Sequence, residues 1–167
     1  MRFADCPTAE VAVRVEAPPA TVWTFVTDLA VLARFSDEFQ GGDWLGPSTG
    51  PGLGERFHGR NANPRASWDV TCTVTECEPD RAFAWCVEDP THPAATWRFT
   101  LEPDGDGTRL AYVARMGPGP SGVTTFIAEH PEDEERILTG RLAAWTANMR
   151  STVEGIRGLA EAEAGSD

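Results

Sequence analysis

The chain has 167 residues, of which 41% are apolar and 24% are charged, and this is the composition of one soluble globular domain. Its 14 basic and 26 acidic side chains give a formal charge of −12, which argues against nucleic acid as a partner because a phosphate backbone would be repelled. No stretch approaches the roughly 20 apolar residues of a membrane-spanning helix, and the N-terminus lacks the pattern of a secretory signal. We therefore expect a cytoplasmic protein that does not insert into membranes.

The first predicted elements are a strand at 11–17, where valines alternate with small or charged residues, and two short helices at 20–27 and 29–35. The glycine-rich segment 40–54 is expected to form a loop with at most a short strand around Trp44. Further strands are predicted where alternating stretches end in turn residues, at 55–61, 68–77, 82–88, 96–101 and 108–116. A long amphipathic helix then runs from Glu132 to about Leu159.

When the predicted strands are paired across their turns, their aromatic and aliphatic residues fall on one face of an antiparallel sheet. This pairing places Val74 opposite Trp85 and Val87 opposite Trp97. The polar residues fall on the opposite face. We therefore predict a curved sheet whose apolar face is covered by the terminal helix and whose other face is exposed to water.

The cysteines lack the spacing of a zinc or redox site. The predicted register places Cys72 on the inner face of the sheet and Cys77 and Cys86 on the outer face, so that Cys72 and Cys86 point apart. We expect free thiols, no metal site and no cofactor.

The order of the elements and several motifs at their boundaries resemble the helix-grip fold of the START-like (SRPBCC) superfamily, which includes polyketide cyclases and the birch pollen allergens. The motifs are V-R-V-E-A-P-P-A-T-V-W at 13–23, G-E-R-F at 54–57, Trp68 with its strand, V-T-E-C-E-P-D-R at 74–81 and G-D-G-T-R-L at 105–110. The resemblance covers nearly the whole chain.

The resemblance implies an α+β fold, in which a curved antiparallel sheet of about six or seven strands wraps around a long C-terminal helix, with two short helices after the first strand. We expect a single domain over residues 1–167, with a core from about 9 to 160 and a flexible tail over 161–167.

The resemblance also implies a ligand cavity between the sheet and the terminal helix, so the inward-facing residues become the candidate lining. The alternative is that the aromatic rings fill the core and leave no space for a ligand. The candidate ligand-binding residues are Phe57, Asn61, Trp68, Trp85, Trp97, Phe99, Tyr112, Trp145, Asn148 and Met149. Glu55, near the edge of the sheet, and Arg60 are candidate polar contacts. The side chain of Arg60 points to the outer face of the sheet unless a bulge near Gly59 moves it to the inner face.

These features favour a protein that binds a hydrophobic small molecule, aromatic or polyketide-like. If the protein is an enzyme, we expect aromatase/cyclase activity. We assign no catalytic residue, because the inner face offers almost no acid or base. One alternative is a non-catalytic carrier or sequestering protein for a hydrophobic metabolite. Another is the protein-interaction or chaperone co-factor type of the superfamily. The chain would be a monomer or a homodimer.

Overall fold

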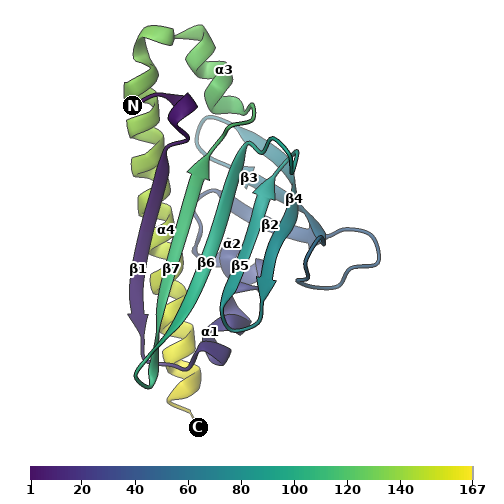
Figure 1. Cartoon of the computed structure of the whole chain (residues 1–167), viewed down its shortest axis with the longest axis vertical. Helices are drawn as coiled ribbons and strands as arrows, with labels where there is room; N and C mark the ends of the chain where they lie inside the picture. Colours follow the sequence, from purple (N-terminus) through teal and green to yellow (C-terminus); the bar gives the residue numbers. More distant parts are fainter. Residues whose placement is uncertain (167) are drawn as a thin grey trace.

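A seven-stranded antiparallel sheet curves around a long C-terminal helix in the computed structural model, which describes residues 1–166 (Figure 1). The strands are β1 (Thr8–Val15), β2 (Phe39–Trp44), β3 (Arg56–Ala62), β4 (Ser67–Glu78), β5 (Ala82–Val87), β6 (Ala95–Asp104) and β7 (Gly107–Met116). The helices are α1 (Pro19–Val26), α2 (Leu29–Phe35), α3 (Gly122–Glu129) and α4 (Glu134–Ala164), with 3₁₀ turns η1 (Phe3–Asp5) and η2 (Pro131–Asp133).

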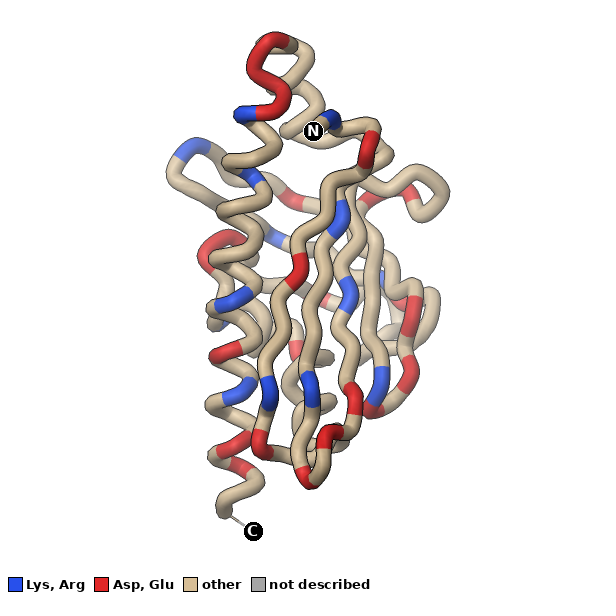
Figure 2. The backbone as a smooth tube through the Cα atoms, turned by 60° about the vertical axis from the view of Figure 1, so that its left-hand side comes forward, with Lys and Arg blue, Asp and Glu red and all other residues tan. Residues whose placement is uncertain are grey.

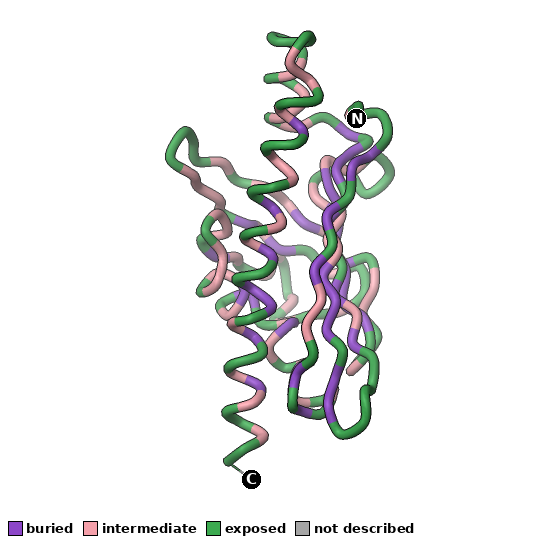
Figure 3. The backbone as a smooth tube through the Cα atoms, turned by 90° about the vertical axis from the view of Figure 1, so that its left-hand side faces the viewer, coloured by how far each residue is buried: buried purple, intermediate pink, exposed green. Residues whose placement is uncertain are grey.

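The order of strands in the sheet is β1-β7-β6-β5-β4-β3-β2. The edge strands are β1, which precedes α1, and β2, which follows α2. Helix α4 lies along the concave side of the sheet near β1 and β7, and α1 and α2 pack beside it (Figure 1). Buried positions recur along α4 and along the strands that it faces (Figure 3). This architecture confirms the predicted helix-grip fold.

The pairing of the strands explains why the predicted inner face is correct although parts of the predicted register are not. Val74 does pair with Trp85, but Val87 pairs with Ala95, and Trp97 pairs with Trp85. The register of β5 against β6 therefore differs from the prediction by two residues. Because side chains alternate between faces with a period of two, this shift leaves every side chain on its predicted face.

A bulge in β4 corrects the prediction for Cys77. The register shifts between Val74 and Glu76, so that Glu76 pairs with Ala84 and Cys77 pairs with Phe83. Cys77 therefore joins the inner face and packs against the core, whereas the sequence had placed it on the outer face. All the cysteines are free thiols in the described residues.

Two elements were not predicted, namely most of β2 and helix α3. Strand β2 uses its glycines for close packing: a side chain at Gly42 would lie 3.2 Å from the ring of Phe39 and from Leu29. The ring of Phe39 also lies over Gly59 on the neighbouring strand β3. The glycine-rich segment, whose composition suggests a loop, therefore forms an edge strand covered by an aromatic ring.

Helix α4 continues through Ala164 and so includes residues 161–164 of the segment that was expected to form the tail. The carboxylate of Glu161 accepts a hydrogen bond of 3.0 Å from the backbone N–H of Glu16 and pairs with Arg157. The hydrogen bond from Glu16 attaches the end of α4 to the residue that follows β1. Asp167, the last residue of the expected tail, lies outside the described residues.

Acidic residues are grouped at the turn between α3 and α4 and at the β6–β7 hairpin (Figure 2). Among the described residues, no helix is both long enough and apolar enough to cross a membrane.

Candidate functional site

The concave face of the sheet carries a group of aromatic side chains in mutual contact, which we call the aromatic cluster. Its members are Phe57, Phe83, Trp85, Trp97, Phe99 and Tyr112 from the sheet and Trp145 from α4. Trp97 stacks on Trp85 at 6.5 Å between ring centroids and meets Trp145 at 4.8 Å. Phe99 and Tyr112 stack at 3.9 Å. The sheet and α4 therefore meet through aromatic rings.

At one end, the concave face is less covered, and we call the residues there the rim: Asn61, Trp68, Val70 and Val87. All are half-buried, whereas Phe57 and Phe99, deeper in the sheet, are at most 2% exposed. The pairing of Asn61 with Trp68 places this end of β3 and β4 beyond the aromatic cluster. The rim thus offers apolar surface and one amide next to the cluster.

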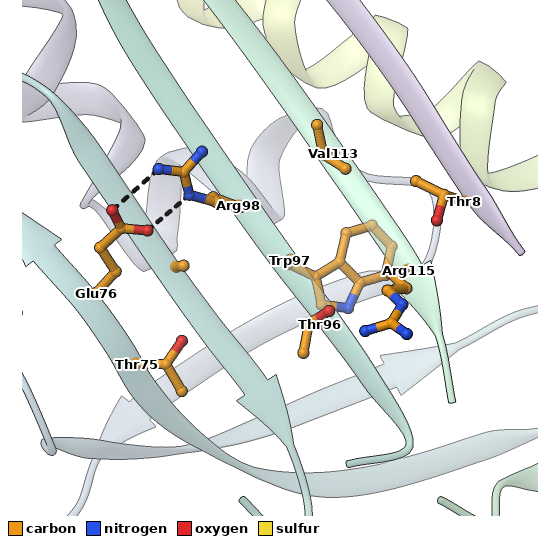
Figure 4. A pocket seen from close by; sticks show the side chains of 9 residues that line it. Thr8, Thr75, Glu76, Thr96, Trp97, Arg98, Val113 and Arg115 are labelled. Carbon is orange, nitrogen blue, oxygen red and sulfur yellow. Dashed lines mark hydrogen bonds and ion pairs between the residues drawn. The ribbon is translucent and has the colours of Figure 1, made fainter. Parts of the chain in front are cut away.

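The expected gap between the sheet and α4 is occupied in part by rings. The ring of Phe39 fills the space above Gly59 on β3. Two surface depressions lie elsewhere in the described residues. One, of about 350 Å³, is on the outer face, where Arg98 pairs with Glu76 beside short side chains such as Val113 (Figure 4). The other, of about 640 Å³, is lined by prolines at the opposite end from the rim.

Helix α4 brings a charged pair to the aromatic cluster. Arg141 lies one helical turn before Trp145, and its guanidinium carbon is 5.5 Å from the centre of the Trp145 ring. Two of its nitrogens bind the carboxylate of Glu38, one of them at 2.9 Å, and both side chains of this pair are only about one-fifth exposed. The ion pair joins α4 to the segment that leads into β2.

Asn148, a candidate ligand contact, fixes the same segment to α4. Its side-chain oxygen accepts a hydrogen bond of 2.7 Å from the backbone N–H of Asp37, and its side-chain nitrogen donates one of 3.1 Å to the hydroxyl of Ser36. Met149, beside it, is 1% exposed and belongs to the core. Both residues therefore have structural partners in the fold.

The two candidate polar contacts, Arg60 and Glu55, have neighbours outside the aromatic cluster. Strand β3 has no bulge at Gly59, and the exposed Arg60 forms an ion pair with Asp43 on β2. Glu55 is half-buried, and its side chain lies beside Gly52 in the preceding loop. The arginine at the aromatic cluster is Arg141, not Arg60.

Burial keeps the titratable groups of the cluster uncharged. Desolvation raises the pKa of the Tyr112 hydroxyl well above its usual range, so this group is a phenol that can donate a hydrogen bond at neutral pH. Desolvation also raises the pKa of the Cys72 thiol, which is then a poor nucleophile. No group of three or more metal-binding side chains is present among residues 1–166.

The sequence analysis missed Arg141 and Glu38 as candidate site residues. Arg141 had a detectable signal, because it precedes Trp145 by four residues and Met149 by eight, which places all three on one face of a helix. Glu38 had no such signal, since its contact with Arg141 depends on how the loop before β2 folds against α4.

Solved structures share this fold. The Polyketide_cyc-like protein Cgl2372 from Corynebacterium glutamicum is 29% identical over 91% of this chain and 90% of that chain, with a TM-score of 0.63. The Zhui aromatase/cyclase from Streptomyces sp. R1128 is 18% identical over 93% of each chain, with a TM-score of 0.69. Ara h 8.0201 is 13% identical over 96% of this chain and 99% of that chain, with a TM-score of 0.55.

Curated proteins gave no match to the sequence. A family model described as polyketide cyclase/dehydrase and lipid transport matches residues 7–156, which include all seven strands and most of α4. The chain therefore belongs to the polyketide cyclase/dehydrase and lipid transport family.

Proposed function

We propose that this protein binds a hydrophobic small molecule, aromatic or polyketide-like, on the concave face between the rim and the aromatic cluster. The observation that carries the proposal is the half-buried rim, where Trp68, Val70 and Val87 leave apolar surface partly open beside fully buried rings. Flat apolar molecules gain affinity on such a surface by stacking and by the removal of apolar area from water.

The polar groups of the site limit the kind of molecule that fits. Tyr112 and the indole nitrogens of Trp97 and Trp145 are hydrogen-bond donors, and Asn61 at the rim is both donor and acceptor. The charges of Arg141 and Glu38 beside the aromatic cluster are paired with each other. A ligand that is mostly apolar, with a few oxygens along one side, matches this distribution.

Cyclase activity is the second candidate, and the buried phenol of Tyr112 favours it. A poly-β-ketone cyclises when a methylene carbon attacks a ketone carbon, and loss of water then leads to the aromatic ring. A site can promote this by holding the chain bent and by donating hydrogen bonds to ketone oxygens, and the phenol of Tyr112 is our candidate donor. The protein named as an aromatase/cyclase among the similar structures supports this candidate.

The binding proposal is tested with fluorene, a three-ring hydrocarbon, by equilibrium dialysis and by thermal unfolding. We expect saturable binding and a raised unfolding temperature. Val70→Glu, which places a charge on the rim, should abolish binding. Val113→Glu is the matched control, because Val113 is also a half-buried valine in a strand but faces the opposite side of the sheet. Equal affinity in the two variants would refute the proposed location.

Catalysis is separated from simple binding by Tyr112→Phe, which removes the hydroxyl and keeps the ring. If the protein is a cyclase, this variant should still bind a poly-β-ketone thioester but lose the formation of cyclised product. If wild type and variant both bind the thioester without any turnover, the carrier function is correct and the cyclase candidate is wrong.

A further inference from the structure

Two hydrogen-bond donors beside the aromatic cluster are buried without a partner among the described residues. They are the indole Nε1 of Trp145 and the Nε of Arg141. Trp145 is 6% exposed, and its ring contacts that of Trp97 on the sheet. The guanidinium of Arg141 lies against the same indole ring. The two unpaired donors are therefore neighbours on the concave side of α4.

Three other polar side chains on this part of α4 find partners within the fold. Asn148 binds the segment before β2, the hydroxyl of Thr146 donates to the carbonyl of Leu142, and the hydroxyl of Thr152 donates to the carbonyl of Asn148. Buried donors without a partner are rare in folded proteins because each one loses its hydrogen bonds to water. Two such donors side by side point to an acceptor that is supplied from outside the chain.

We infer that the molecule bound on the concave face, whose existence rests on the function proposed above, carries an uncharged carbonyl oxygen that accepts hydrogen bonds from Trp145 and Arg141. Both groups can only donate, so the ligand atom that meets them must be an acceptor. A ketone or quinone carbonyl on an aromatic frame meets this requirement and also fits the surrounding rings.

Charge distinguishes a carbonyl from a carboxylate at this position. The other nitrogens of Arg141 already bind Glu38, so the positive charge of the guanidinium is compensated. A ligand carboxylate would lie near the Glu38 carboxylate in a half-buried site, and the two like charges would repel. The site should therefore bind aromatic ketones more tightly than aromatic acids of the same size.

The test compares three ligands that differ at one carbon: fluorene, 9-fluorenone and fluorene-9-carboxylate. Their dissociation constants are measured by equilibrium dialysis, which does not depend on tryptophan fluorescence. We expect wild-type protein to bind 9-fluorenone about tenfold more tightly than fluorene, the effect of one or two added hydrogen bonds. Fluorene-9-carboxylate should bind no more tightly than fluorene.

Trp145→Phe keeps an aromatic ring and removes the donor, so the ratio of the affinities for 9-fluorenone and fluorene should fall close to one, whatever the affinity for fluorene itself becomes. Arg141→Lys keeps the positive charge beside Glu38 and removes Nε; it should also reduce the preference, and it serves as the test if Trp145→Phe does not fold by circular dichroism.

Equal affinity of wild type for fluorene and 9-fluorenone would overturn the inference and leave the proposed binding function intact. A preference that persists in both variants would overturn it as well. Failure of wild type to bind fluorene and 9-fluorenone would overturn the binding function together with the inference.

Discussion

Replacing Gly155 in α4 by alanine should destabilise the protein, because the ring of Phe35 packs directly against this glycine. A side-chain carbon at position 155 would lie 2.3 Å from two ring carbons of Phe35. Carbon atoms in contact are separated by about 3.5–4.0 Å, so the ring would have to move by more than about 1 Å. Phe35 ends α2, and the next residues are those that Asn148 and Arg141 attach to α4.

The size of the effect follows from two opposing contributions. Inserting a methyl group into packed space costs about 1–3 kcal/mol, and the 2.3 Å approach to Phe35 places this substitution in the upper part of that range, at about 2–3 kcal/mol. Exchanging glycine for alanine within a helix returns about 1 kcal/mol. We therefore expect a net loss of about 1–2 kcal/mol in the free energy of unfolding. For a domain of this size, that loss lowers the melting temperature by about 2–8 °C.

Urea denaturation and differential scanning calorimetry measure this change, with Gly158→Ala as the matched control. Gly158 lies in the same helix, but a side-chain carbon there would meet no atom within 4 Å. The control should therefore gain up to about 1 kcal/mol from helix propensity alone. If both variants were stabilised to the same extent, the packing of α2 against α4 described here would be wrong.

Three further predictions concern the contacts around the site and the outer face. Asn148→Ala removes the bonds to Ser36 and to the following backbone N–H, and hydrogen exchange should show faster opening of this segment with a loss of about 1–2 kcal/mol in chemical unfolding. The hydrogen bonds from Arg98 lower the pKa of Glu76, so Glu76→Gln should cost up to about 1 kcal/mol at pH 7. That difference should shrink as the pH falls below the ordinary glutamate pKa of 4.5 and vanish below the lowered pKa of Glu76 in the folded protein, where the wild-type carboxylate is protonated. A difference that persists at that acidity would contradict the assignment. The buried thiol of Cys72 should resist iodoacetamide at neutral pH until urea unfolds the chain, as followed by peptide mass spectrometry, and rapid labelling of the native protein would show that it is accessible.

Alternation of side chains along the strands was enough to predict the inner face of the sheet. Phe99 faces Tyr112 and Trp85 faces Val74 in the structure, as the turn positions indicated, and the shift of two residues between β5 and β6 did not move Trp97 to the other face. The aromatic cluster could therefore be predicted from local sequence, because its members depend on the face of each strand and not on the exact pairing.

Features that depend on a single contact distant in sequence could not be predicted in this way. The bulge after Val74 moves Cys77 to the inner face, and nothing in the local pattern marks an extra residue. Strand β2 pairs with β3, and the ring of Phe39 on β2 covers Gly59, which is twenty residues away. The partner of Arg141 was hidden for the same reason, since Glu38 reaches it only after the chain has folded.

The most direct test of ligand binding on the concave face is the ¹H–¹⁵N spectrum of the tryptophan indoles during a titration with 9-fluorenone. We expect the indole signals of Trp68, Trp97 and Trp145 to shift in a saturable manner, while that of Trp23, which packs against Phe83 from α1, stays in place. Saturable shifts confined to backbone amides of the outer face, with all indole signals unmoved, would contradict the proposed site.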